Sequence, residues 1–109
     1  MLQFADYSKK NPKNNNSLPV IFGAGIIGRM TLEALSQKNI KVAFFCDSNP
    51  TKQKIKVNNL EVVSPDALDK LDKETNIFIT VQYFNSIIPF LEKKGFKNLY
   101  KVTDLLSDS

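Results

Sequence analysis

Three closely spaced glycines form the sequence pattern in this chain that most directly indicates a binding function. They stand in Gly23-Ala24-Gly25-Ile26-Ile27-Gly28, a complete G-x-G-x-x-G motif. Between a strand and a helix, such a motif allows a tight turn, lets phosphate oxygens approach the backbone and brings the helix close to the strand. The helix then turns its free N–H groups and positive dipole end toward an anion. These six residues are therefore predicted to form a phosphate-binding loop.

Asp47 is the second candidate site residue. It ends the next apolar run, about 20 residues beyond the motif, where dinucleotide-binding folds use a carboxylate to accept hydrogen bonds from ribose hydroxyls. A carboxylate there repels a 2′-phosphate, which disfavours NADP and leaves NAD or a UDP-sugar as the expected ligand. A second interpretation also fits: the glycines only pack helix on strand, and Asp47 caps a turn with Asn49.

Four further residues are expected beside the ligand. Ser48 follows Asp47, and Val81, Gln82 and Tyr83 end a later apolar run that should form the other wall of the crevice. The sequence has no histidine and a single cysteine, Cys46, which is expected to pack as a small apolar residue. We find no nucleophile–base pair, metal-ligand set or paired carboxylates, so neither a catalytic nor a metal site is predicted.

The elements that must position these residues alternate along the chain. Short apolar runs predict strands at 19–22, 41–46, 60–63, 76–81 and 98–102. Apolar residues at helical spacing predict a helix from about Ile27 to near Lys38-Asn39 and another after Ser64-Pro65. A third is predicted from about Asn85 or Ser86, where Pro89 favours a late start or a kink. Residues 51–59 are expected to form a loop, with at most a brief extended piece at 55–57.

This alternation predicts an α/β fold with a parallel sheet and right-handed crossovers. We expect an abbreviated doubly wound, Rossmann-like sheet of about five strands in the order 3-2-1-4-5, with the ligand crevice between strands 1 and 4. Residues 18–109 should form this nucleotide-binding domain. Residues 1–17, which end in a polar, turn-forming stretch, are expected to be a flexible arm or linker, although Leu2, Phe4 and Tyr7 offer a short amphipathic turn.

Composition excludes several classes of protein. The net charge is +4, and part of it comes from lysines near the N-terminus, so the balance does not favour nucleic-acid binding. No apolar stretch approaches the roughly 18 residues that a membrane span requires, and no secretory signal is recognisable. A lone cysteine forms no disulfide within the chain, which favours a cytoplasmic location.

Four segments resemble a known group of domains: Val20–Arg29, Phe44–Asn49, Glu61–Leu68 and Gly95–Tyr100. Similar small Rossmann-like domains occur in bacterial surface-glycan enzymes, including the N-terminal domain of bacillosamine-type acetyltransferases, polysaccharide dehydratases, and domains fused to sugar methyltransferases and glycosyltransferases. The resemblance implies binding of a UDP-sugar or related nucleotide, with Gly23, Gly25 and Gly28 in the phosphate loop and Asp47 as hydroxyl acceptor. The acetyltransferases often have a histidine at the position of Gly28, and they continue into a left-handed β-helix. This sequence has neither feature, so acyl transfer is not expected.

We therefore predict a non-catalytic nucleotide- or nucleotide-sugar-binding module of surface-polysaccharide biosynthesis, which works with a covalently linked or associated catalytic domain. Two alternatives stay open. The chain is the cofactor-binding part of an NAD-dependent dehydrogenase or dehydratase, or it is an interaction or oligomerisation domain that binds no ligand. Whether the chain takes part in catalysis stays open. A binding domain of a larger or partner enzyme is favoured over a complete catalyst, because 109 residues leave no space for a second, substrate-binding region.

Overall fold

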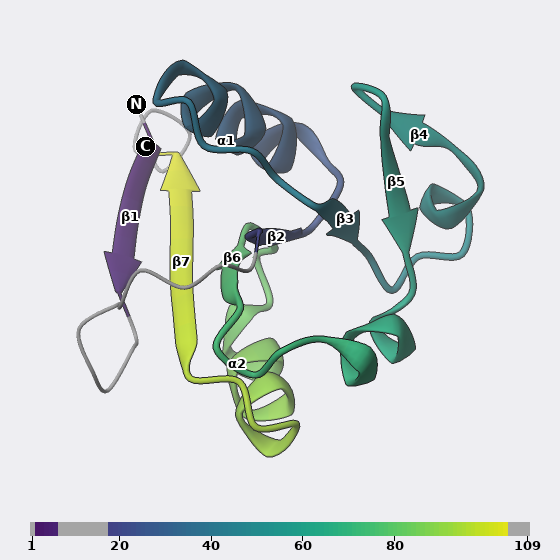
Figure 1. Cartoon of the computed structure of the whole chain (residues 1–109), viewed down its shortest axis with the longest axis vertical. Helices are drawn as coiled ribbons and strands as arrows, with labels where there is room; N and C mark the ends of the chain where they lie inside the picture. Colours follow the sequence, from purple (N-terminus) through teal and green to yellow (C-terminus); the bar gives the residue numbers. More distant parts are fainter. Residues whose placement is uncertain (1, 7–17, 105–109) are drawn as a thin grey trace.

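The structure, a computed structural model, describes residues 2–6 and 18–104. One seven-stranded sheet runs in the order β1-β7-β6-β2-β3-β5-β4 (Figure 1). Its strands are β1 (Leu2–Asp6), β2 (Val20–Phe22), β3 (Phe44–Cys46), β4 (Lys56–Val57), β5 (Leu60–Val63), β6 (Asn76–Ile79) and β7 (Asn98–Asp104). The helices are α1 (Ile26–Gln37), α2 (Phe84–Lys93) and the 3-10 helices η1 (Lys52–Lys54) and η2 (Pro65–Lys70).

The predicted α/β class is confirmed, but the sheet is larger than predicted. Its five parallel strands run β5-β3-β2-β6-β7. An antiparallel strand is added at each edge, since β1 pairs with β7 and β4 pairs with β5. The complete order therefore differs from the predicted order of five strands.

The first added strand, β1, lies in the segment that the sequence predicted to be a loose arm. Its Phe4 ring packs edge-on against Phe78, with 5.6 Å between ring centroids, and Phe78 stacks on Tyr100 of β7 at 5.1 Å. These rings give β1 an apolar contact as well as backbone pairing, which explains why residues 2–6 are ordered into the sheet. Residues 7–17 of the predicted arm lie outside the described residues.

The second added strand, β4, covers two residues of the loop expected at 51–59 and lies within the brief extended piece expected at 55–57. Val57 pairs with Leu60, so Asn58 and Asn59 form a two-residue turn, and both have positive φ (51° and 67°). Hairpin turns of this kind require positive φ at both central residues, and asparagine tolerates it better than most residues. η1 occupies residues just before β4.

The helices follow the sequence pattern with two differences. α1 ends at Gln37, near the predicted Lys38-Asn39, and Asn39 has a φ of 61°. The helix expected after Ser64 is the 3-10 helix η2, which has Pro65 at its start but no hydrogen bond from the Ser64 side chain. α2 begins at Phe84 and keeps Pro89 inside it, so the predicted later start is wrong.

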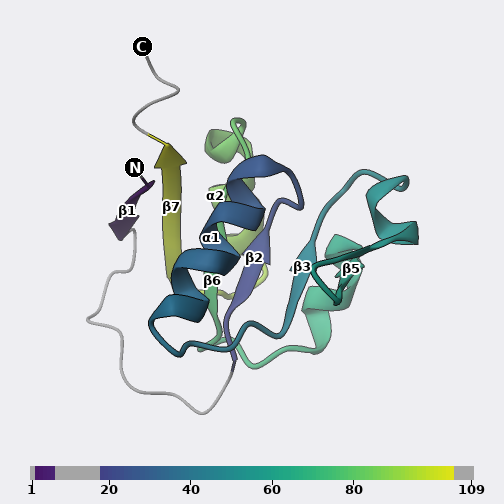
Figure 2. The same ribbon diagram turned by 90° about the horizontal axis from the view of Figure 1, so that it is seen from above.

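Alternate residues of the central strands divide between two apolar clusters. Val20 and Phe22 of β2 belong to one cluster, together with Ile87 and Leu91 of α2. The other cluster holds Ile21 of β2 and residues of the opposite face, including Leu35 of α1, Phe45 and Phe78. α1 and α2 therefore cover opposite faces of the central strands, as Figures 1 and 2 show. In the described part of the chain, no helix has the length and apolarity that crossing a membrane requires.

Candidate functional site

The glycine loop connects β2 to α1 at the carboxyl edge of the parallel strands. β3 holds it on one side. The Gly23 N–H donates to the Cys46 carbonyl oxygen at 2.7 Å, and the Ala24 N–H donates to Oδ2 of Asp47 at 3.0 Å. Both donors belong to buried residues, so these bonds satisfy backbone groups that water does not reach.

β6 holds the loop on the other side through Thr80. The Thr80 hydroxyl lies 3.0 Å from the Phe22 carbonyl oxygen and 3.2 Å from that of Gly23, and the Thr80 N–H donates to Phe22 at 2.9 Å. Thr80 is not among the site residues predicted from the sequence. Its role follows from the pairing of Phe22 with Ile79, which puts the residue after β6 beside Gly23, and no local pattern in the sequence reveals that register.

The three glycines differ in what surrounds them. A Cβ at Gly23, which has a φ of 118°, would meet the Thr80 side chain and approach Val81. A Cβ at Gly28 would collide with the Gly23 carbonyl oxygen. At Gly25, by contrast, a Cβ would meet nothing within 4 Å. Packing therefore requires the first and third glycines, whereas the second leaves open space above the loop.

The first turn of α1 borders this open space. Gly25 is the N-cap residue, has no capping side chain, and accepts the Arg29 N–H on its carbonyl oxygen at 3.0 Å. The first helical turn contains no acidic residue. The amide groups at the start of a helix have no partner within the helix, and its dipole makes this end positive. The arrangement can bind an anion such as a phosphate.

The other predicted loop residues contribute in different ways. Ile26 is 77% exposed at the start of α1. Ile27 packs against the cluster on the α1 face, so its side chain belongs to the core and only its backbone borders the loop.

Asp47 is buried, with 8% of its surface exposed. Oδ2 accepts the Ala24 N–H, and Oδ1 accepts the Asn49 N–H at 2.9 Å. The Asp47 carbonyl oxygen accepts a further bond from Nε2 of Gln53 at 2.7 Å. The carboxylate therefore connects the end of β3 to the glycine loop. It also makes the turn bond to Asn49 that was expected if Asp47 caps a turn instead of binding a ribose. Its contact with a ribose stays a prediction.

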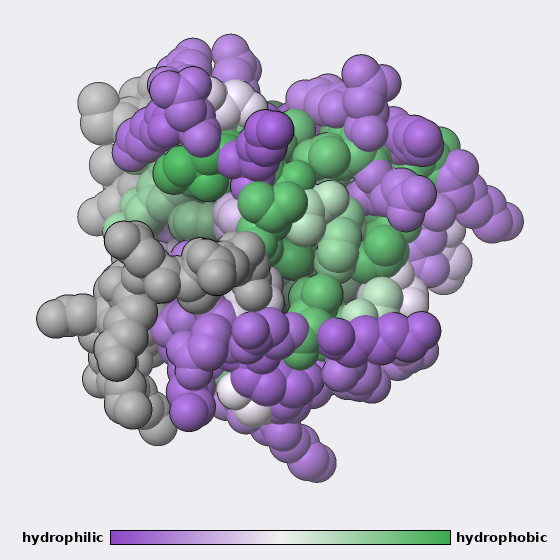
Figure 3. Space-filling model, in the orientation of Figure 1, coloured by the Kyte–Doolittle hydropathy of each residue, from purple (hydrophilic) through white to green (hydrophobic). Residues whose placement is uncertain are grey.

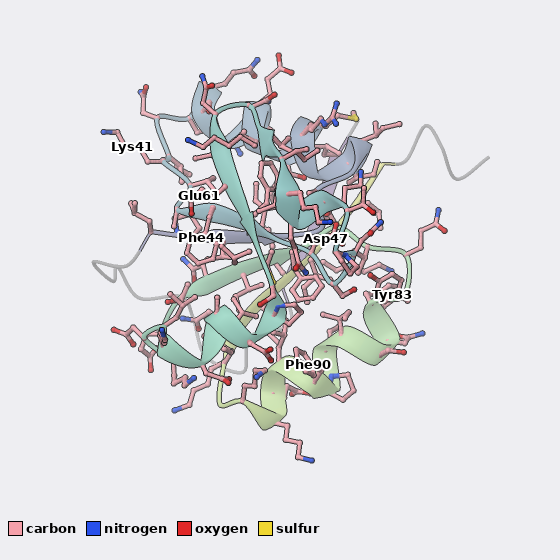
Figure 4. The ribbon with its side chains drawn as sticks, turned by 90° about the vertical axis from the view of Figure 1, so that its right-hand side faces the viewer. Lys41, Phe44, Asp47, Glu61, Tyr83 and Phe90 are labelled. Atoms are coloured by element: carbon pink, nitrogen blue, oxygen red, sulfur yellow. The ribbon has the colours of Figure 1, made fainter. Side chains whose placement is uncertain are left out.

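Ser48 and Tyr83 approach each other from opposite sides of β2. Their hydroxyl oxygens are 3.4 Å apart, and both residues are exposed. Figure 4 shows Asp47 and Tyr83 toward one side of the molecule, and Lys41 and Phe44 toward the other. Of the remaining predicted residues, Val81 is half-buried near Gly23, and Gln82 is exposed.

Cys46 is fully buried within the sheet, as predicted. Burial, with a smaller contribution from the Asp47 charge, raises the pKa of its thiol to about 12. The thiolate is the nucleophilic form of cysteine, and a thiol with this pKa stays protonated at neutral pH. Cys46 is therefore a structural residue beside the loop rather than a reacting group.

The molecule also has recesses away from the loop. One of about 560 Å³ lies between α1 and the start of β5, with Leu32, Lys41, Val42 and Leu60 among its lining residues. These residues lie toward the amino edge of the parallel strands, opposite the glycine loop. Figure 3 views this side and shows apolar surface gathered over β3 and the lower part of β5.

Comparison of the chain with protein-family models, with curated protein sequences and with solved structures finds no match.

Proposed function

We propose that this chain binds the phosphates of a nucleotide or nucleotide sugar on the loop Gly23–Gly28. The observation that carries the proposal is the open space above Gly25 at the uncapped start of α1. Asp47 and Thr80 hold the first two loop residues, Ala24 and Gly23, from both sides, which lowers the entropy that ordering the loop around an anion would cost. Such a site holds a ligand without supplying an acid, a base or a nucleophile.

The proposed architecture is an abbreviated doubly wound, Rossmann-like sheet. Two features support it: the parallel order β5-β3-β2-β6-β7, and the position of α1 and α2 on opposite faces of the central strands. In sheets of this type, ligands bind outside the carboxyl ends of the strands, where the strand order reverses. β2 is the strand at which the order reverses here, because it is followed in the chain by its neighbour β3 on one side and later by β6 on the other.

The ligand class rests on the resemblance in sequence. It favours a UDP-sugar and a function in surface-glycan biosynthesis, together with a covalently linked or associated catalytic domain. NAD is the second candidate, and it would make the chain the cofactor-binding part of a dehydrogenase or dehydratase.

Substitution of Gly25 tests the proposal. We expect Gly25→Val to abolish binding of NAD, UDP or UDP-N-acetylglucosamine, whichever the natural protein binds, because the new side chain fills the space that the phosphates need. The thermal unfolding midpoint should change little, because a Cβ at this position meets no protein atom within 4 Å and the φ of Gly25 is −89°. Isothermal titration calorimetry measures binding, and circular dichroism measures unfolding.

Ser36→Val is the matched control, since Ser36 is exposed near the other end of α1. This variant should bind like the natural protein. If Gly25→Val also binds like the natural protein, the phosphate-loop assignment is wrong. If the natural protein binds none of the three compounds, the interaction-domain alternative gains support.

A further inference from the structure

Two hydroxyl groups meet between the segments that follow β3 and β6. Ser48 follows β3, and Tyr83 follows β6, and these two strands are the neighbours of β2 on either side. A contact between the segments that follow β3 and β6 therefore spans the end of β2, where the glycine loop begins. The Ser48 and Tyr83 hydroxyls make this contact at 3.4 Å.

Backbone hydrogen bonds hold the main chain at or beside both residues. The Tyr83 carbonyl oxygen accepts the N–H groups of Ser86 and Ile87, at 3.0 and 3.4 Å, so Tyr83 is fixed as the N-cap residue of α2. Ser48 follows Asp47. The Asp47 N–H donates to the Val63 carbonyl oxygen at 3.0 Å, and the Asp47 carbonyl oxygen accepts a hydrogen bond from Nε2 of Gln53. Positions fixed before binding reduce the entropy that binding costs.

The Asp47 carboxylate, by contrast, is already used by the protein. Each of its oxygens accepts a backbone N–H, and the residue is buried. Ser48 and Tyr83 are exposed, and their mutual contact is longer than the usual 2.7–2.8 Å for hydroxyl groups. A hydroxyl has one donor and two acceptor positions, so this pair keeps unused hydrogen-bonding capacity.

We propose that the Ser48 and Tyr83 hydroxyls, rather than the Asp47 carboxylate, bind the sugar hydroxyls of a nucleotide whose phosphates lie on the glycine loop. This proposal rests on the proposed function. Two oxygens 3.4 Å apart leave room for a third oxygen about 2.8 Å from each, so one sugar hydroxyl can bond to both. The half-exposed Tyr83 ring supplies an apolar face beside it.

Two substitutions remove only the hydroxyls: Ser48→Ala and Tyr83→Phe. The probes are UDP, ADP, their 2′,3′-dideoxy analogues and UDP-N-acetylglucosamine, titrated by calorimetry at fixed salt. For a ribose contact, each variant should bind UDP or ADP about 3- to 10-fold more weakly and bind the dideoxy analogue as the natural protein does. For a contact to the hexose, only the binding of UDP-N-acetylglucosamine should weaken.

Ser36→Ala and Tyr100→Phe are the control variants. They change residues outside this pair and should leave all affinities unchanged.

Other results overturn the inference. Equal weakening of the ribose and dideoxy ligands would show that the pair acts on something other than sugar hydroxyls. Unchanged affinities in both variants, with binding still lost in Gly25→Val, would remove the hydroxyl pair and leave the phosphate loop standing. If the natural protein binds none of the probes, the inference and the proposed function both fail.

Discussion

At the scale of single residues, Asp47 joins three neighbouring segments. Its carboxylate reaches the glycine loop through Ala24 and the following turn through Asn49, and its backbone N–H donates to the Val63 carbonyl oxygen of β5. The sequence predicts this residue for its chemistry and its distance from the motif. It does not predict that the carboxylate turns inward, because that depends on the close approach of the ends of β2 and β3, which pair in the sheet.

Asp47→Ala should lower the free energy of unfolding by about 2–3 kcal/mol. The substitution leaves the buried Ala24 N–H without its acceptor and removes two hydrogen bonds to a charged group. Asp47→Asn should lie between the alanine variant and the natural protein, since it keeps one acceptor oxygen. Urea denaturation followed by circular dichroism measures these differences.

Asp72→Ala is the matched control for this prediction. Asp72 makes the same local bond, from the N–H two residues later to Oδ1 at 2.9 Å, but at an exposed position. Its loss should cost less than about 1 kcal/mol, as is usual for surface substitutions. If Asp47→Ala is no more destabilising than Asp72→Ala, the carboxylate does not hold the loop.

The residues of the glycine motif were more predictable than the contacts around them. The packing of the three glycines agrees with the roles that the motif predicts: Gly23 has a φ of 118° in the turn out of β2, Gly28 lies against the Gly23 carbonyl group, and Gly25 faces open space. These features depend on one turn between a strand and a helix, whereas the crowding of Gly23 by Thr80 depends on the pairing with β6. Thr80 and Gln53 bond to residues that the motif or its spacing had identified, but nothing in their own local sequence marks them.

At the scale of elements, β1 is the clearest departure from the sequence prediction. Residues 2–6 form a short segment followed by a polar, turn-forming stretch, and this local sequence predicts a flexible chain end. Its partner β7 lies at the other end of the chain, and the Phe4–Phe78–Tyr100 contacts join three strands. Periodicity within a segment carries no information about a partner so distant, whereas the parallel strands and α1 have strong patterns of their own.

Deleting residues 1–6 should lower the free energy of unfolding by about 2–4 kcal/mol. The deletion removes the pairing with β7, exposes the Phe78 ring and uncovers apolar surface against which Leu2 packs. Phe4→Ala alone should cost about 1–2 kcal/mol, because Phe4 is 38% exposed and its contribution is mainly the ring contact. Urea denaturation of the deletion variant and the point variant gives both values.

A loss below about 0.5 kcal/mol in the deletion variant would contradict this prediction. It would favour the loose arm that the sequence indicates. The binding of phosphate ligands should be unchanged in either case, since β1 lies at the edge of the sheet and three strands away from β2.

At the scale of the whole molecule, one sheet carries both the site and the two apolar clusters. β2 lies between β6 and β3, and its three residues are completely buried, so the loop that follows it begins from a fixed strand. α1 starts at the loop and packs on one face, and α2 starts near Tyr83 and packs on the other. The same packing that forms the core therefore also positions the two walls of the candidate site.

This arrangement predicts that the two clusters respond independently to substitution. Leu35→Ala on α1 should cost about 2–5 kcal/mol and Ile87→Val on α2 about 0.5–1.5 kcal/mol, and the double variant should lose the sum within about 0.5 kcal/mol. Leu91→Ala with Ile87→Val is the comparison pair, because these side chains are four residues apart on one helix and belong to one cluster. That pair should depart from additivity by at least about 0.5 kcal/mol. Urea denaturation of the single and double variants measures both couplings. Equal coupling in the two pairs would mean that the sheet does not separate the faces.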